Sequence, residues 1–419
     1  MAREVAENVS PQLNMNLTGN EAIAHGARLS RVEMTFFLPI GPSDEVGETM
    51  GQFYATGAME GKIVELEGED ANFAGLAAAS QSGIRAMFCT NSAGVKKGLP
   101  CIAGDAFGRI PLMLPMPHRH IGGGGGILAD WGDIVILRDM AWILVQAESS
   151  QECLDLVPQM WKIAENPEIR LPVVIGYEGW EISHSDERCF VPTVEDMDKF
   201  LPSRPGRDSL LTQGDWRDSM SQRTGRNIRS GGVPEIRYSL YQTLDRAREL
   251  MKQGDEEYGQ LFGRRWGGAV DDSLCKDGEG KDAEVVFVTM ASMLPTCRVA
   301  VEIARELGIS AGLLKLRMLN PFPSVDVLEA LKNAKVVIAL DRHESAVIYH
   351  HIRSIMFAQS NRPQVLGRIV GLGGETVSID DMMDIFEEGR RAAQGETVPD
   401  IGWLLKGLAS GQGIFPHPI

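Results

Sequence analysis

The feature that most constrains the fold is a repeated alternation of short apolar runs with longer amphipathic segments. From about residue 17 to 180, runs such as "EMTFFLPI", "IRAMFCT", "DIVILR" and "RLPVVIGY" alternate with helical patterns such as "GNEAIAHGARLSRV" and "SSQECLDLVPQMWKIAEN". This alternation is typical of βαβ units, whose parallel strands are buried on both faces. The first half of the chain is therefore predicted to be an α/β domain with a largely parallel sheet.

The same rhythm begins again near residue 283, after a stretch of different character. Residues 203–233 are polar, rich in Gly and Arg and only weakly periodic, and a long helical pattern follows them. "VVFVTMAS", "SAGLLKLRML" and "KVVIALD" then indicate the strands of a second α/β domain. We therefore expect a first domain over residues 1–202, a connector with a helical segment over 203–282, and a second domain over 283–419.

Charge and cysteine content argue against several classes of partner and cofactor. The formal net charge of -16 opposes binding to nucleic acid or to an anionic membrane, because both require clustered Lys and Arg. No run of about 18 apolar residues occurs, and the first thirty residues lack the apolar segment of a signal peptide, so we expect a cytoplasmic protein. The cysteines lack the spacing of a zinc or iron–sulfur site and are predicted to be free thiols: Cys89, Cys101, Cys153, Cys189, Cys275 and Cys297.

The segment "VELEGEDANFAGLAAASQSG" places four carboxylates immediately before an Ala- and Gly-rich run with the composition of a tightly packed helix. They belong to Glu65, Glu67, Glu69 and Asp70, and Glu69 falls at the expected start of the helix. One interpretation is a helix N-terminal charge, which free N–H groups and the helix dipole stabilise. The other is a buried acid whose raised pKa lets it hydrogen-bond a cofactor nitrogen. Spacing alone leaves both interpretations open.

A second candidate segment, "FFLPIGPSDEVGE", follows a predicted strand. Ligands bind at strand ends in open α/β sheets, so this loop is a place to search for a site. Pro39, Gly41 and Pro42 form a rigid turn that presents backbone and little side chain at its tip. An ordinary strand-ending turn would have the same composition.

A third candidate segment, "PLMLPMPHRHIGGGGGILADWGD", places Arg119 between His118 and His120, directly after a Met- and Pro-rich strand. Arg119 is a plausible carboxylate clamp, because the guanidinium N–H fork matches the geometry of a carboxylate. The five glycines at 122–126 cannot hold one backbone conformation cheaply. They could form a mobile lid or an ordinary surface loop.

Several quoted segments, among them "LPIGPSDEVGE", "VELEGEDANFAGLAAASQSGIRAMFCTNSAG", "SSQECLDL", "PVVIGYEGWEISH", "LLKLRMLNPFP" and "GRIVGLGGETVSIDD", occur in one characteristic order. In this order the chain resembles the α subunit of 2-oxoacid:ferredoxin oxidoreductases, the pyruvate:ferredoxin oxidoreductase family, from about residue 17 to 390. The resemblance implies a thiamine-diphosphate-binding, pyrimidine-type parallel-sheet domain followed by a transketolase-C-like α/β domain.

On this resemblance, Glu69 matches the family's acid that hydrogen-bonds N1′ of the thiamine aminopyrimidine. A carboxyl group at N1′ favours the imino tautomer, whose 4′-nitrogen removes the C2 proton of the thiazolium. Arg119 matches the family's substrate-binding Arg, which pairs with the carboxylate of a 2-oxoacid. The resemblance further assigns Pro39 and Asn91 to the cofactor, and Gly41, Ile40 and His118 to the substrate.

The resemblance also implies that this chain carries only part of such a site. It has no GDG motif followed about thirty residues later by Asn, the signature for the diphosphate and Mg²⁺, and it lacks the cysteines for [4Fe-4S] clusters. We expect a β subunit to supply the diphosphate and Mg²⁺ site, ferredoxin-like iron–sulfur and γ-type subunits to supply the clusters, and coenzyme A to be the co-substrate. The α chain alone should be inactive, and its Arg-rich connector is a candidate contact with a partner.

Gly41 departs from the family pattern, because the family commonly has Thr at this position of its YPITP motif. The loss of that side chain favours a bulkier or less polar 2-oxoacid than pyruvate, and Met113 and Met116 could form adaptable walls. Phenylglyoxylate is the expected type of substrate, with indolepyruvate, branched-chain acids and pyruvate as alternatives, while an oxalate-type enzyme is disfavoured. Two rival functions are a lipoamide-linked 2-oxoacid dehydrogenase and a non-catalytic scaffold; Glu69 and Arg119 argue against the scaffold.

Overall fold

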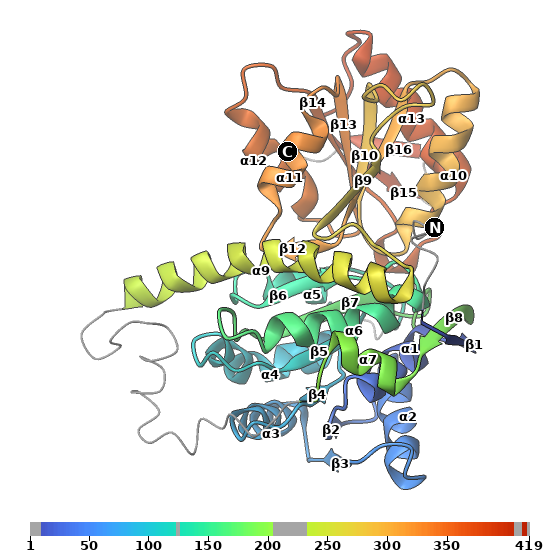
Figure 1. The fold of residues 1–419 in the computed structure, drawn as a ribbon. Helices are drawn as coiled ribbons and strands as arrows, with labels where there is room; N and C mark the ends of the chain where they lie inside the picture. The colour runs from blue at the N-terminus through green and yellow to red at the C-terminus, as the bar shows by residue number, and fades with distance from the viewer. Residues whose placement is uncertain (1–9, 123–125, 204–232, 406–412, 417–419) are drawn as a thin grey trace.

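The structure, a computed structural model, describes residues 10–122, 126–203, 233–405 and 413–416. It contains two α/β domains, one above the other in Figure 1, each built around its own mainly parallel sheet. The predicted fold class is confirmed: a parallel-sheet domain of the expected type precedes a second α/β domain.

The first sheet is parallel except at one edge. Its strands lie in the order β12 (Met318–Asn320), β6 (Ile143–Gln146), β7 (Val173–Glu178), β5 (Met113–His118), β4 (Ala86–Phe88), β2 (Met34–Phe37) and β3 (Lys62–Glu65). Only β12 runs antiparallel to its neighbour, β6. Because β12 comes from the second half of the chain, this sheet joins the two halves.

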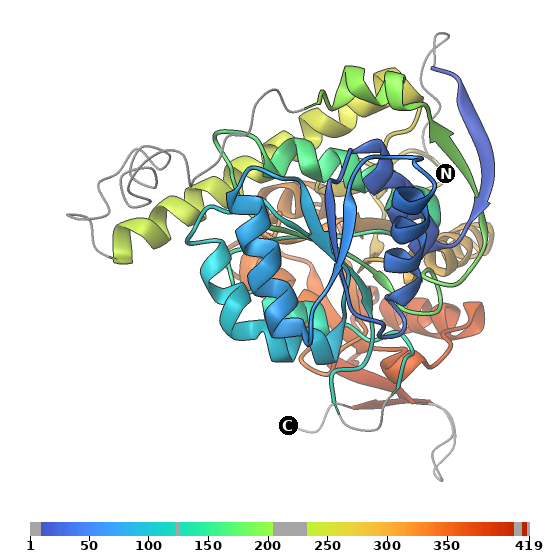
Figure 2. The same ribbon diagram turned by 90° about the horizontal axis from the view of Figure 1, so that it is seen from below.

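Helices cover both faces of the first sheet, as Figure 2 shows from below. One face carries α1 (Gly19–Leu29), α2 (Asp44–Ala55) and α6 (Ser150–Ala164), and the other carries α3 (Glu69–Gln81), α4 (Ser92–Asp105) and α5 (Gly132–Leu137). A capping box of Thr18 and Glu21 starts α1. Gly26 then lets α1 approach α6 closely, because a Cβ atom there would lie 2.8 Å from the Leu154 carbonyl oxygen.

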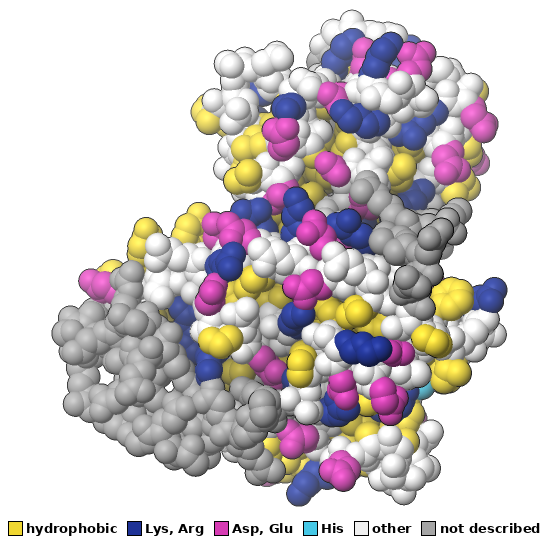
Figure 3. All heavy atoms as spheres, in the orientation of Figure 1, with side chains coloured by type: hydrophobic (Ala, Val, Ile, Leu, Met, Phe, Trp, Pro, Cys, Tyr) yellow, Lys and Arg dark blue, Asp and Glu magenta, His cyan; other side chains and the backbone are white. Residues whose placement is uncertain are grey.

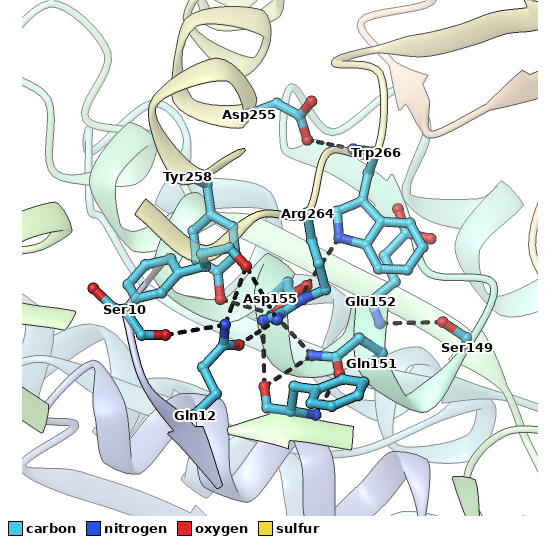
Figure 4. Close-up of polar contacts among 12 residues, drawn as sticks. Ser10, Gln12, Ser149, Gln151, Glu152, Asp155, Asp255, Tyr258, Arg264 and Trp266 are labelled. Carbon is cyan, nitrogen blue, oxygen red and sulfur yellow. Dashed lines mark hydrogen bonds and ion pairs between the residues drawn. The ribbon is translucent and has the colours of Figure 1, made fainter. Parts of the chain in front are cut away.

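The helix α9 (Val233–Phe262) crosses the molecule between the two domains in Figure 1. A buried carboxylate, that of Asp155 on α6, anchors the C-terminal end of α9 and the chain that follows it (Figure 4). Asp155 accepts hydrogen bonds from the Tyr258 hydroxyl at 2.7 Å, from Arg264 Nε at 2.9 Å and from Trp266 Nε1 at 3.0 Å. All of these polar groups are paired, so we assign the cluster a structural role.

Nearby lie β1 (Gln12–Leu17), which pairs antiparallel with β8 (Glu187–Pro192), and α7 (Val194–Phe200).

The second sheet is also mainly parallel, with antiparallel strands at both edges. Its order is β16 (Gly413–Pro416), β15 (Ile401–Leu405), β14 (Gln364–Ile369), β13 (Val336–Asp341), β10 (Val285–Thr289), β11 (Ala311–Leu316) and β9 (Val270–Leu274). The helical elements of this domain are α10 (Met293–Glu306), α11 (Ser324–Leu331), α12 (Val347–Phe357), the 3₁₀ turn η2 (Leu372–Gly374) and α13 (Ile379–Ala393).

Local readings of the sequence differ from the structure at three places. "DIVILR" belongs to α5 and not to a strand, because a short apolar run has the same pattern in a buried helix and in a buried strand. "LLKLRML" forms two strands, β11 and β12, which enter different sheets. β9 lies within the stretch expected to be connector, yet it is an edge strand of the second sheet.

A buried ion network joins the domains where the chain passes from β11 to β12. Arg317 donates from Nε to Glu152 of α6 at 2.6 Å, and Lys315 donates to the same carboxylate at 2.8 Å. Arg317 and Glu152 are both 0% exposed. The packing of the second domain on the first therefore depends on charges that water does not reach.

Replacement of Arg317 by Met is expected to destabilise the chain by about 3–5 kcal/mol, because it leaves a buried carboxylate incompletely paired. Urea unfolding of the purified chain, followed by intrinsic fluorescence, measures the loss. Arg353→Met is the matched control, because Arg353 makes an ion pair with Asp400 at the surface, where its side chain is 57% exposed. Equal stability of the two variants would contradict the assignment of the network.

The surface mixes both signs of charge. On the face shown in Figure 3, Lys and Arg side chains alternate with Asp and Glu, and they do not merge into one broad basic area. Among the described residues, every helix is too short or too polar to cross a membrane.

Candidate cofactor and substrate site

The loop that follows β2 is the meeting point of three segments far apart in the sequence. Its Gly41 carbonyl oxygen accepts a hydrogen bond from Asn91 Nδ2 at 3.2 Å and another from Arg119 Nη1 at 2.6 Å. Asn91 directly precedes α4 and Arg119 directly follows β5. The structure therefore brings the predicted residues Gly41, Asn91 and Arg119 together at the carboxyl ends of the parallel strands.

Both the backbone and the side chain of Arg119 make hydrogen bonds. Its backbone N–H donates to Asp133 Oδ2 at 3.1 Å, and its side chain reaches the Gly41 carbonyl oxygen. Its Nε is buried and has no hydrogen-bond partner within the part of the chain that the structure describes. An unpaired buried donor costs free energy, so the guanidinium is suited to bind an anionic ligand.

His118, one residue earlier, is completely buried between two side chains. Its Nδ1 lies 2.8 Å from Asp133 Oδ1 and its Nε2 lies 2.9 Å from Gln146 Oε1. Burial is the largest single influence and lowers the pKa of His118, but the charge and hydrogen bond of Asp133, the charge of Glu178 and the hydrogen bond of Gln146 together outweigh burial, so the pKa lies above its ordinary value. Both ring nitrogens are thus occupied. These contacts favour a role for His118 in supporting Asp133 and Arg119, and not the direct substrate contact that the sequence led us to expect.

Glu69 is the first residue of α3, as the pattern predicted, and it is also buried. Its exposed fraction is 8%, whereas Glu65, Glu67 and Asp70 are all exposed. The two interpretations of this acid are therefore compatible, because a helix N-terminus can stabilise a carboxylate that packing has removed from water. The interaction that pairs its charge is with Lys97 of α4, whose Nζ lies 3.2 Å from Glu69 Oε2.

The space beside Glu69 is shaped by the start of α4. A Cβ atom at Gly94 would lie 2.9 Å from Glu69 Cγ and 2.1 Å from Thr90 Oγ1, so only glycine fits there. Thr90 Oγ1 and Asn91 Oδ1 are buried and have no hydrogen-bond partner among the described residues. A buried acid beside unpaired polar atoms fits a heterocycle with ring nitrogens, such as the aminopyrimidine of thiamine.

The remaining predicted residues lie around this centre. Pro39 is exposed, and Ile40 is half-buried and accepts hydrogen bonds from Ser43 through its carbonyl oxygen. Of the glycine run at 122–126, residues 123–125 lie outside the described residues. Among the residues that are described, no three His, Cys, Asp or Glu side chains are grouped closely enough to hold a metal ion.

Sequence reasoning missed four residues that build this site. Asp133 and Gln146 hold His118, and Asn20 donates from Nδ2 to the Pro42 carbonyl oxygen at 2.9 Å. The fourth is Lys97. The position of Asp133 among apolar residues after the glycine run was the available signal for this residue. Lys97 gave no such signal, because its sequence pattern is that of a solvated helix face.

A mainly parallel α/β sheet with a buried acid at the head of a helix and an Arg at a neighbouring strand end is the arrangement expected of a thiamine-diphosphate-binding fold. The particular family follows from comparison with known proteins. Residues 25–253 match the family described as pyruvate flavodoxin/ferredoxin oxidoreductase, thiamine diphosphate-binding, and residues 283–382 match pyruvate:ferredoxin oxidoreductase core domain II. The chain belongs to this family.

Curated relatives are similar over nearly their whole length. Pyruvate synthase subunit PorA of Pyrococcus furiosus is 26% identical over 399 residues, which cover 93% of this chain and 96% of the relative. Ketoisovalerate oxidoreductase subunit VorA of Pyrococcus horikoshii is 26% identical over 392 residues, covering 92% and 96%.

Solved structures share the fold. A 2-oxoglutarate:ferredoxin oxidoreductase from Magnetococcus marinus has a TM-score of 0.65 and 18% identity, and the match covers 91% of this chain and 65% of that one. A split-gene transketolase, as an inactive beta4 tetramer, has a TM-score of 0.54 and 11% identity, covering 90% of this chain and 98% of that one.

Proposed function

We propose that this chain is the α subunit of a multisubunit 2-oxoacid oxidoreductase. The complex would convert a 2-oxoacid and coenzyme A to acyl-CoA and CO₂, with the two electrons leaving through iron–sulfur clusters of partner subunits. The observation that supports the proposal is the junction at Gly41, where Arg119, the proposed carboxylate clamp, and the start of α4, which packs on Glu69, meet one loop.

Glu69 would hold the cofactor by hydrogen-bonding N1′ of its aminopyrimidine. When bound, thiamine diphosphate supplies the carbanion that attacks the keto carbon and stabilises the charge left when CO₂ departs. Arg119 would pair with the substrate carboxylate. This pairing would also orient the carbonyl group for attack, which lowers the barrier to the reaction. Pro39 and Asn91 would bound the cofactor side of the loop, and Ile40 and Gly41 the substrate side.

Partner subunits complete the proposed site. A β subunit would bring the diphosphate and Mg²⁺ site, and ferredoxin-like and γ-type subunits would bring the [4Fe-4S] clusters. Purification of the assembled complex without oxygen, followed by measurement of its iron and thiamine diphosphate and by a 2-oxoacid panel with a viologen dye, tests this. A thiamine complex that contains no iron and reduces lipoamide would favour the dehydrogenase alternative, and a complex inactive with all acids would favour the scaffold.

The proposed substrate is a bulky or aromatic 2-oxoacid such as phenylglyoxylate, with pyruvate and branched-chain acids as the alternatives. Open space at Gly41 supports this reading, because a Cβ atom there would have Asp44 Oδ1, 4.0 Å away, as its nearest neighbour. The names of the two curated relatives refer to a small and to a branched 2-oxoacid. The panel therefore has to include all three types.

Replacement of Gly41 by Thr is expected to lower kcat/KM for the bulkier acid relative to pyruvate by about tenfold, because a branched side chain would take up part of the open space at this position. Steady-state kinetics of the assembled complex with both acids measure the ratio. Gly104→Thr is the control, because a Cβ atom at Gly104 also meets open space, but at the far end of α4. An unchanged ratio in Gly41→Thr would remove the support for a widened pocket.

A further inference from the structure

The lysine that faces Glu69 is placed by the packing of two helices. Lys97 lies in the second turn of α4, and α4 packs closely on α3 because a Cβ atom at Gly98 would strike the Phe73 ring at 2.1 Å. From this position Lys97 Nζ lies 3.2 Å from Glu69 Oε2 and 3.5 Å from Asp70 Oδ1. The ammonium group therefore sits at the head of α3, directly over its first carboxylate.

Gly68 leaves room for this placement of the lysine. A Cβ atom at Gly68 would lie 2.3 Å from Lys97 Nζ, so the lysine crosses the backbone where it has no side chain. The neighbouring Lys96 points elsewhere and donates to the Ile121 carbonyl oxygen at 2.9 Å. Two adjacent lysines of α4 thus contact two parts of the site: Lys97 contacts the Glu69 carboxylate, and Lys96 contacts the loop after Arg119.

The other charged groups near the head of α3 are carboxylates. Asp70 lies next to Glu69 on α3 and also contacts Lys97, while Glu65 and Glu67 precede it and are exposed. From α4, Lys97 is the cation in contact with Glu69, and the hydrogen bond to Glu69 raises the pKa of Lys97 above its ordinary value. Lys97 consequently stays charged throughout the range in which a carboxylate titrates.

We infer that Lys97 is a positioning residue for cofactor activation: it holds the Glu69 carboxylate in place and keeps it ionised beside N1′ of thiamine. An ionised carboxylate would accept a strong, charge-assisted hydrogen bond from a protonated ring nitrogen, whereas a protonated Glu69 would offer only the weaker acceptor of a neutral carbonyl oxygen. The inference rests on the proposed role of Glu69. It adds Lys97 to the site, although a lysine at a half-exposed helix position does not by itself suggest a function.

The test compares Lys97→Met, Lys97→Arg and a control in the assembled complex. Lys97→Met removes the cation that pairs with the carboxylate, so the acid limb of kcat/KM is expected to move up by roughly one pH unit. The dissociation constant for thiamine diphosphate, measured by calorimetry, is expected to rise roughly threefold to tenfold. Lys97→Arg should restore both values, because it keeps the charge. Circular dichroism of the bound cofactor, which distinguishes its tautomers, provides a readout independent of turnover.

Lys335→Met is the matched control, because the Lys335 side chain is 56% exposed and pairs with Glu284 in the second domain, against 52% for Lys97. Lys97→Met with an unshifted acid limb and an unchanged dissociation constant would overturn the inference and leave the role of Glu69 intact. Full turnover in Glu69→Gln would instead overturn the proposed role of Glu69, and an unmodified complex inactive with every 2-oxoacid would overturn the proposed function itself. Size-exclusion chromatography of each variant complex shows whether assembly is preserved.

Discussion

Replacement of Glu69 by Gln in the assembled complex is expected to lower kcat by about a thousandfold. Gln keeps the size of the side chain and can still contact N1′, but it cannot act as an ionised acceptor that promotes the imino tautomer. The cofactor would then remain bound while removal of its C2 proton becomes slow. Exchange of the C2 proton in deuterated water, followed by proton NMR after acid quench, measures that step without dependence on the electron acceptor.

Glu67→Gln is the matched control for this experiment. Glu67 lies in the same segment and carries the same charge, but its side chain is exposed whereas Glu69 is buried. We expect Glu67→Gln to exchange and turn over at the unmodified rate. Equal effects of the two substitutions would mean that the acidic segment acts through its summed charge, and the assignment of Glu69 would then be wrong.

Replacement of Arg119 by Met is expected to lower kcat/KM for the 2-oxoacid by about 100- to 1000-fold, because the proposed charge-assisted pairing with the substrate carboxylate would be lost. The effect should fall on kcat as well as KM if the clamp also orients the carbonyl. The Gly41 carbonyl oxygen loses a donor in this variant, but Asn91 Nδ2 still reaches it. Steady-state kinetics of the assembled complex with a viologen dye give both constants.

Arg119→Lys separates charge from geometry at the same position. Lysine keeps the positive charge without the planar fork, so it should recover only part of the lost kcat/KM. Arg246→Met is the control, because Arg246 lies on α9 and pairs with Glu168 and Glu249 at the surface. A variant Arg119→Met that retains normal kinetics would place the substrate carboxylate elsewhere, while the fold and the family would stand.

Periodicity predicted most of the first domain correctly because its strands are short apolar runs and its helices have clear caps. Thr18 and Glu21 start α1, and Ser378 and Asp381 start α13 with the same reciprocal pattern. The pattern failed where local sequence carries too little information. "DIVILR" has six residues that suit a strand or a buried helix equally, and tertiary packing selects the helix.

The sequence by itself determined the α/β class and the family resemblance, because hydrophobic periodicity and motif order are properties of the chain alone. Only the tertiary structure decided which residues meet. Arg119 and Asn91 converge on the Gly41 carbonyl oxygen from separate strands and helices, and β12 returns to the first sheet across the domain boundary. Burial of one carboxylate among four, and the lysine that pairs with it, likewise depend on how α3 and α4 pack. Contacts between distant segments follow from the packing of whole helices and sheets, which local sequence does not encode.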